Sequence, residues 1–193
     1  MRRSDFRGPA YCLIRFGPGA VGLDFVRAEK YNPNMVPKVY IETSFVSYLT
    51  ARPSRDVVIA GHQQVTHEWW NTRRLNYELC VSKLVLDEAA EGDAQVAQDR
   101  LLVLQPMLVL EMTAEALELA KELLRVGALP KKAADDALHV AVAATMTVPF
   151  LLTWNCRHLA NAVMRPIIEA TCKANGFQAP VICTPEELLE VKR

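Results

Sequence analysis

The sequence lacks an excess of charge, long apolar runs and paired cysteines. Its 22 Lys and Arg residues balance 22 Asp and Glu residues, which excludes a strongly basic coat for nucleic acid and leaves only a local patch for such binding. The longest apolar runs, such as residues 101–110, are broken by polar residues or proline and are too short to span a bilayer. The 5 cysteines form no C-x-x-C pair, and their odd number argues against a disulfide framework and favours a reducing cytoplasm.

Several motifs of common catalytic sites are also missing. The chain has no G-x-G-x-x-G, Walker A or G-x-S-x-G pattern, and His67-Glu68 does not continue as H-E-x-x-H. A dinucleotide site, a P-loop, a serine-hydrolase elbow and a zinc-protease helix therefore find no support. A general α/β protein that binds a small phosphorylated ligand should carry a glycine-rich loop after a strand, so this hypothesis ranks last.

The chain has enough residues for one domain with a full core. It contains 193 residues, of which 51% are hydrophobic and 23% charged, as is typical of a globular protein. Regular patterning starts near Met35, so we expect one domain over residues 35–193. Residues 1–34 lack a clean apolar stretch, which argues against a signal peptide. We expect a poorly patterned N-terminal extension there, either a loosely packed segment or an upstream start that the cell does not use.

Short continuous apolar runs alternate with helical patterns after Met35. Strands are expected at residues 39–41, from 79 onward, and at 107–111, 149–155 and 179–183. Helices are expected at residues 44–52, 55–78, 94–105, 113–127 (N-capped by Thr113), 130–146 (opened by Pro130) and 160–176 (with Pro166 as a candidate break), and after a Thr184 cap. Unbroken apolar strands indicate a parallel sheet covered on both faces, hence an α/β fold with right-handed crossovers. Ligands in such folds bind outside the carboxyl ends of the strands.

Acidic side chains stand close to these expected strand ends. Glu42 directly follows the first strand, Glu88 lies just past the second, and Asp136 begins an Ala- and Val-rich helix. A solvated helix face explains Glu88, and the helix dipole explains Asp136, about as well as a ligand role does. Glu42 is harder to explain as a surface acid, because two hydroxyls follow it and suit a hard cation with its water. Oxygen ligands alone indicate Mg²⁺ or Mn²⁺ rather than zinc.

His139 follows Asp136 by three residues in the same expected helix. We interpret it as a packed, hydrogen-bonded histidine, and a contact with the acidic site stays open.

Four segments, in this order and spacing, resemble the PIN-domain superfamily, and in particular the VapC-like ribonuclease toxins of type II toxin–antitoxin pairs. They are YIETS at 40–44, VSKLVLDEAAEG at 81–92, DDALHVAVAA at 135–144 and LLTWNCRHLAN at 151–161. The resemblance covers residues 36–193. It implies a PIN-like, Rossmann-type parallel β-sheet flanked by helices on both faces. It also implies Mg²⁺ or Mn²⁺ at the carboxyl edge of the sheet, where the ion activates a water to attack an RNA phosphodiester.

The resemblance assigns metal binding to Glu42, Glu88 and Asp136, and catalysis to these acids with Asn155. Two departures stand out, because the first acid is usually Asp and the T-x-D motif reads Thr153-Trp154-Asn155 here. Glu42 is one methylene longer, and Asn155 accepts a hydrogen bond from water but adds no charge. Three carboxylates neutralise one divalent cation, whereas a second cation would be held more weakly with Asn155 than with Asp.

Substrate contacts are expected from hydroxyls and from local positive charge. Thr43 or Ser44 corresponds to the small hydroxyl of the family near its first acid, and Thr153 to the T-x-D threonine. The cations closest in sequence to the expected site are Lys131, Lys132 and Arg157. For each single cation, an ordinary solvated surface charge remains the competing interpretation.

These observations lead to one main hypothesis and one rival. The main hypothesis is a metal-dependent endoribonuclease that acts as the toxin of a type II toxin–antitoxin pair. Its partners would be RNA, a small antitoxin protein that blocks the site and a second copy of the chain in a homodimer, with no membrane involved. The rival is a PIN-fold RNA-binding or regulatory module with little or no nuclease activity, which the departures at Glu42 and Asn155 motivate.

Overall fold

The structure, a computed structural model, describes residues 36–189, so the prediction for residues 1–34 lies outside the described residues. The strands are β1 (Lys38–Ile41), β2 (Glu78–Ser82), β3 (Leu108–Leu110), β4 (Phe150–Leu152) and β5 (Val181–Cys183). The helices are α1 (Thr43–Thr50), α2 (Val57–Thr72), η1 (Arg74–Asn76, a 3₁₀ turn), α3 (Lys83–Ala89), α4 (Ala94–Leu104), α5 (Ala114–Arg125), α6 (Ala134–Thr145) and α7 (Arg165–Ala174).

The strands form one parallel sheet with the order β3-β2-β1-β4-β5. The chain builds outward from β1 to β3, then returns past β1 to add β4 and β5. The order therefore reverses between β1 and β4, where Val39 pairs with Phe150 and Ile41 with Leu152. Loops leave in opposite directions at such a reversal and open a crevice at the carboxyl edge of the sheet.

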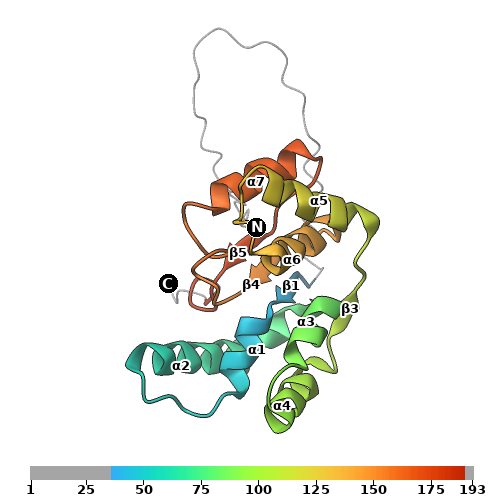
Figure 1. The fold of residues 1–193 in the computed structure, drawn as a ribbon. Helices are drawn as coiled ribbons and strands as arrows, with labels where there is room; N and C mark the ends of the chain where they lie inside the picture. Colours follow the sequence, from blue (N-terminus) through green and yellow to red (C-terminus); the bar gives the residue numbers. More distant parts are fainter. Residues whose placement is uncertain (1–35, 190–193) are drawn as a thin grey trace, which may run out of the picture. The chain divides into compact units, whose positions relative to one another are not determined.

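The helices form two packing groups, with the strands between them (Figure 1). Helix α1 contacts α2, α3 and α4, whereas α5 contacts α6 and α7. Right-handed crossovers explain this division, because connections that run in opposite directions along the sheet place their helices on opposite faces. The predicted α/β class, with a parallel sheet flanked by helices on both faces, is confirmed.

The central strand β1 lies at the heart of the core. Val39, Tyr40 and Ile41 are all fully buried, which explains why this strand reads as a continuous apolar run rather than an alternating one. Phe45 of α1 packs edge-on against Trp69 of α2, with ring centroids 5.4 Å apart. Among the described helices, none has the length and apolar character needed to cross a membrane.

Several helix boundaries follow from local capping chemistry. The Thr113 hydroxyl accepts the N–H of Ala116 at 3.2 Å, which confirms it as the N-cap of α5. Gly127, just past this helix, adopts φ +76°, a left-handed conformation that glycine tolerates better than other residues.

Four expected helix boundaries are wrong. The helix expected over residues 55–78 ends at Thr72, and Glu78 already belongs to β2. Helix α6 begins at Ala134 rather than Pro130, because residues 130–133 close a turn in which the Ala133 N–H donates to Pro130 O at 2.8 Å. Helix α7 begins at Arg165, so Pro166 lies in its first turn instead of breaking a longer helix. The segment after Thr184 forms turns, although the Thr184 hydroxyl still accepts the Glu187 N–H at 3.3 Å.

Candidate metal centre

Glu42 lies where the strand order of the sheet reverses. It follows β1 as the N-cap residue of α1, and its backbone N–H donates to Leu152 O at the end of β4 at 3.1 Å. Only 7% of Glu42 is exposed. A carboxylate this buried is costly unless its oxygens find partners or a cation. Its position therefore makes the carboxyl edge of the sheet beside β1 and β4 the candidate site.

Two hydroxyls satisfy the Oε2 atom of Glu42. Fully buried Thr153 donates its hydroxyl to this oxygen at 2.7 Å, and the Ser44 hydroxyl donates to the same atom. The Ser44 oxygen in turn accepts the Trp154 backbone N–H at 2.8 Å. Both hydroxyls thus position the carboxylate, while their predicted contact with substrate stays a prediction.

Glu88 of α3 approaches Glu42 from the neighbouring strand connection. Its Oε2 accepts the Thr43 hydroxyl and lies 3.2 Å from Nε2 of His139 on α6. One ligand atom from each of Glu42, Glu88 and His139 can be chosen so that all lie within 4.8 Å of one another. We call Glu42, Glu88 and His139 the paired-glutamate cluster.

A buried hydrogen-bond chain holds the imidazole of His139. Its Nδ1 lies 2.8 Å from the Tyr40 hydroxyl, which lies 2.7 Å from Ser82 Oγ. Burial favours neutral His139, but the hydrogen bond with Glu88 and the nearby acidic charges outweigh burial and raise the pKa of His139. Burial likewise favours neutral Glu88, but His139 and Thr43 outweigh it and lower the pKa of Glu88. Protonated His139 therefore compensates part of the acidic charge when no other cation does.

Asp136 belongs to a second hydrogen-bonded group. Its Oδ1 accepts the side-chain amide of Asn155 at 2.7 Å, and its Oδ2 lies 2.8 Å from Nδ1 of His158. The Asn155 side-chain oxygen accepts the His158 backbone N–H at 3.1 Å, which closes the group. We call Asp136, Asn155 and His158 the Asp136 cluster. It lies near the first cluster, because Asp136 and His139 stand three residues apart on α6. The charge of Asp136 also helps to raise the pKa of His139.

The structure thus divides the predicted catalytic residues between two clusters. Glu42 and Glu88 share the first, while Asp136 and Asn155 pair with each other in the second. Over residues 36–189, the set of potential ligand atoms within 4.8 Å of one another contains His139 and does not contain Asp136. The assignment of metal binding and catalysis to the four predicted residues remains a prediction.

The predicted substrate-binding cations lie on the surface. Lys131 and Lys132 are exposed in the turn before α6, and Arg157 is exposed in the turns after β4. These segments lead directly into Asp136 and His158, so the cations flank the Asp136 cluster in sequence. Exposed cations at a site edge suit the phosphates of a polymer, and this role stays a prediction.

The side chains of the paired-glutamate cluster are of the kinds that bind divalent cations. It combines two carboxylates with one imidazole, and hydroxyls hold the carboxylates in place. The lysine and arginine ion pairs observed across residues 36–189 involve other acids: Asp87, Glu118, Glu122 and Glu187. A cation at this edge of the sheet would therefore neutralise Glu42 and Glu88.

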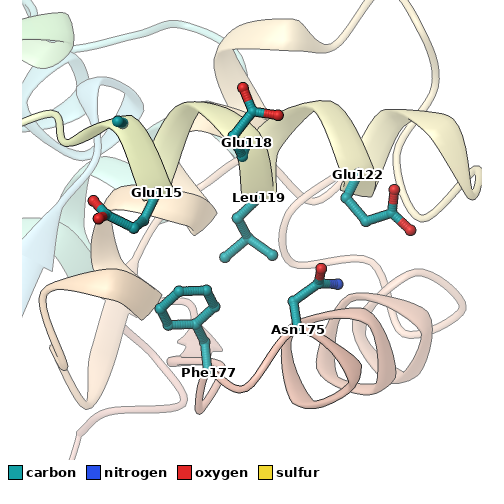
Figure 2. Close-up of a pocket in the computed structure, with 7 residues that line it drawn as sticks. Glu115, Glu118, Leu119, Glu122, Asn175 and Phe177 are labelled. Carbon is teal, nitrogen blue, oxygen red and sulfur yellow. The ribbon is translucent and has the colours of Figure 1, made fainter.

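A separate groove of about 500 Å³ runs between α5 and the end of α7 (Figure 2). Glu115, Glu118 and Glu122 of α5 line one side, and Asn175 and Phe177 lie opposite. Glu118 pairs with Lys121 and Glu122 with Arg125, so neighbouring cations already compensate two of these acids. This groove shares no residue with either cluster and lacks the converging ligand atoms of the paired-glutamate cluster.

Comparison with solved structures shows the fold of this chain. The chain is similar to the Mycobacterium tuberculosis protein VapC20, described as a sarcin-ricin loop cleaving toxin, with 17% sequence identity and a TM-score of 0.51. The match covers 65% of this chain and 95% of VapC20. At this identity the likeness establishes the fold alone, and it confirms the predicted PIN-like arrangement.

A weaker structural match is VapBC2 from Rickettsia felis, solved with a DNA fragment from its promoter. It has 14% identity and a TM-score of 0.49, and it covers 76% of this chain and 97% of the matched chain. No family model and no curated protein matches the sequence.

Two histidines take a larger part in the site than the sequence indicated. His139 is a packed, hydrogen-bonded residue as predicted, but it also joins Glu42 and Glu88 within 4.8 Å. His158, next to the predicted cation Arg157, pairs through its ring with Asp136. The three-residue spacing of Asp136 and His139 was the available signal, since residues three apart are neighbours on a helix surface.

Proposed function

We propose that the protein is a metal-dependent endoribonuclease that cleaves RNA phosphodiester bonds as the toxin of a type II toxin–antitoxin pair. One observation carries the proposal: buried Glu42 and part-buried Glu88 converge at the reversal point of a parallel sheet, in a fold similar to that of VapC20. We infer that Glu42, Glu88 and Asp136 provide the negative charge that holds Mg²⁺ or Mn²⁺.

The cation, when bound, would make a water more acidic and neutralise charge on the phosphodiester. The protein's own groups prepare the site. Thr153 and Ser44 orient the Glu42 carboxylate, and Thr43 orients Glu88. Asn155 holds Asp136 through its amide, and its side-chain oxygen is already used by the His158 N–H. Fixed ligands of this kind avoid reorganisation during the reaction, which is the usual source of catalytic advantage.

RNA and protein partners belong to the same proposal. Lys131, Lys132 and Arg157 would contact phosphates next to the Asp136 cluster, because all three are exposed cations in the adjoining turns. The resemblance of residues 36–193 to VapC-like toxins supports a small antitoxin protein as a further partner. We propose a homodimer in the cytoplasm, with no membrane association.

RNA cleavage by the purified protein tests this function. We expect cleavage with Mn²⁺ and its loss with EDTA, and a strong loss in Asp136→Asn. The exposed control Asp99→Asn on α4 should cleave like the unaltered protein, since the Asp99 side chain is exposed and accepts a hydrogen bond from Gln95 on the same helix. Cleavage that persists unchanged with EDTA and in Asp136→Asn would reject the proposed mechanism.

The second candidate is a PIN-fold RNA-binding or regulatory module with little nuclease activity. It is favoured by the hydrogen bonds that engage both oxygens of Asp136, with Asn155 and with His158. Calorimetric titration separates the two functions. No heat of Mn²⁺ binding at millimolar concentration, together with retained RNA binding, would favour this module over the nuclease.

A further inference from the structure

The ligand set of the cation site follows from the paired-glutamate cluster. The expectation from the sequence was a site of oxygen ligands only. In the structure, the imidazole of His139 stands 3.2 Å from Glu88 Oε2 and within ligand spacing of Glu42. It is 1% exposed, so water does not explain its orientation.

The surroundings of His139 direct one ring nitrogen into the cluster. Nδ1 contacts the Tyr40 hydroxyl, and that hydroxyl also contacts Ser82 Oγ, so both polar partners lie behind the ring. If Nδ1 carries the proton and donates to Tyr40, Tyr40 can donate to Ser82. Nε2 then presents a lone pair toward the glutamates. Ligating histidines commonly use their second nitrogen in this way, to fix tautomer and ring orientation.

A lone pair facing two carboxylates is unfavourable unless a cation lies between them. The cluster has two ways to satisfy this demand: a proton on Nε2, or a metal ion shared by Nε2 and the glutamates. The two are alternatives at one position. Binding of a metal ion would therefore replace the hydrogen bond between His139 and Glu88.

We propose that Nε2 of His139 is a direct nitrogen ligand of the cation, together with Glu42 and Glu88, and that Asp136 contributes charge but no ligand atom. The assignment of His139 as a ligand does not depend on the proposed function; only its role in catalysis rests on that function. Imidazole suits transition metals better than Mg²⁺, which prefers oxygen ligands. The site should therefore bind Mn²⁺ more tightly than Mg²⁺, and Co²⁺ or Zn²⁺ should compete with Mn²⁺.

Pulsed electron paramagnetic resonance of the full chain with Mn²⁺ tests the nitrogen ligand directly. We expect a ¹⁴N coupling in the unaltered protein that changes to the ¹⁵N pattern when only histidine is labelled with ¹⁵N. This measurement needs no variant, so it stands even if a His139 variant does not fold. Bound Mn²⁺ without a nitrogen coupling would overturn the proposal, as would the absence of Mn²⁺ binding.

Two variants then identify the histidine. His139→Asn keeps a polar group near Nδ1 for Tyr40 but removes Nε2, so it should lose the coupling and bind Mn²⁺ about 10- to 100-fold more weakly. His158→Asn should keep the coupling, and exposed His67→Asn is the matched control. A coupling that survives His139→Asn and disappears in His158→Asn would overturn the proposal and move the ion to the Asp136 cluster.

The outcomes distinguish this inference from the proposed function. Nitrogen-coupled Mn²⁺ without RNA cleavage would reject the nuclease and support the ligand assignment. Mn²⁺-dependent cleavage without a nitrogen coupling would support the nuclease and reject His139 as a ligand.

Discussion

The paired-glutamate cluster and the Asp136 cluster contain similar side chains but differ in how well neighbouring groups compensate their carboxylate charge. Each contains acidic and imidazole groups at the carboxyl edge of the sheet. In the Asp136 cluster, Asn155 and His158 each engage one oxygen of a single carboxylate. In the paired-glutamate cluster, two carboxylates share one buried imidazole, so negative charge remains in excess. Acids that lie close together therefore do not identify a metal site by themselves. Negative charge that neighbouring groups leave uncompensated is the better guide.

The largest expected effect comes from Glu42→Gln, which removes one of the two carboxylate charges of the paired-glutamate cluster. We expect Mn²⁺-dependent RNA cleavage to fall at least about 100-fold, the upper end of what loss of an outer-shell residue costs. The same change should raise the free energy of unfolding of the metal-free protein by about 1 kcal/mol, because carboxylate repulsion with Glu88 is relieved.

Initial cleavage rates and urea unfolding in EDTA measure the two effects of Glu42→Gln. The matched control is Glu78→Gln at the exposed start of β2, which should change neither. Equal cleavage by both variants would show that the Glu42 carboxylate is not needed for cleavage, and would contradict the placement of the metal site at the paired-glutamate cluster.

Tyr40→Phe tests the support behind His139. Removing this fully buried hydroxyl leaves Ser82 and Nδ1 of His139 without their partner, which should lower the free energy of unfolding by about 1–3 kcal/mol. Mn²⁺ affinity should also fall, because the ring loses the contact that orients it. Chemical denaturation and calorimetry measure these changes. Tyr48→Phe on α1 is the control, and an equal loss of Mn²⁺ affinity there would show that the Tyr40 hydroxyl has no special role.

Asn155→Asp would give the Asp136 cluster the acid that the family resemblance leads one to expect. It replaces the amide that donates to Asp136 at 2.7 Å with a second carboxylate. We expect the metal-free protein to lose about 1–2 kcal/mol of unfolding free energy from this repulsion. Part of the loss should return with Mn²⁺, because the new charge favours a nearby cation. Thermal melts with and without Mn²⁺ test this, and a variant equally stable in both conditions would contradict it.

The smallest effect is a pH dependence of the metal-free protein. His139 has a raised pKa, so its pairing stabilises the fold below the ordinary histidine pKa of about 6.5 and is lost as the pH rises through the folded-state value. Glu88 has a lowered pKa, so its contribution is present above about 4.5 and is lost at more acidic pH. We expect the pairing to stabilise the fold most between these values.

Urea unfolding in EDTA from pH 5 to pH 9 measures this dependence. The free energy of unfolding should fall on the alkaline side, and should fall less in His139→Asn. Identical profiles for the two proteins would show that another group causes the change.

Much of the fold was predictable from local sequence. The unbroken apolar run at residues 39–41 indicated a strand buried on both faces, and Thr113 marked the start of α5. Pro130 misled the prediction for α6, because proline suits both a helix start and the turn that the chain forms there. Local preferences alone could not decide between two conformations that both accept proline.

The sequence by itself determined that Glu42 and Glu88 follow strand ends at one edge of a parallel sheet. Both follow neighbouring strands of a parallel sheet, and parallel strands bring their carboxyl ends to one edge. Only the tertiary structure decided which other side chains join them. His139 reaches the glutamates because α6 places its ring against the Tyr40 hydroxyl of β1. Asp136, one turn earlier on α6, instead contacts Asn155 and His158. These contacts depend on how a helix packs across the sheet, and spacing along the chain does not encode that packing.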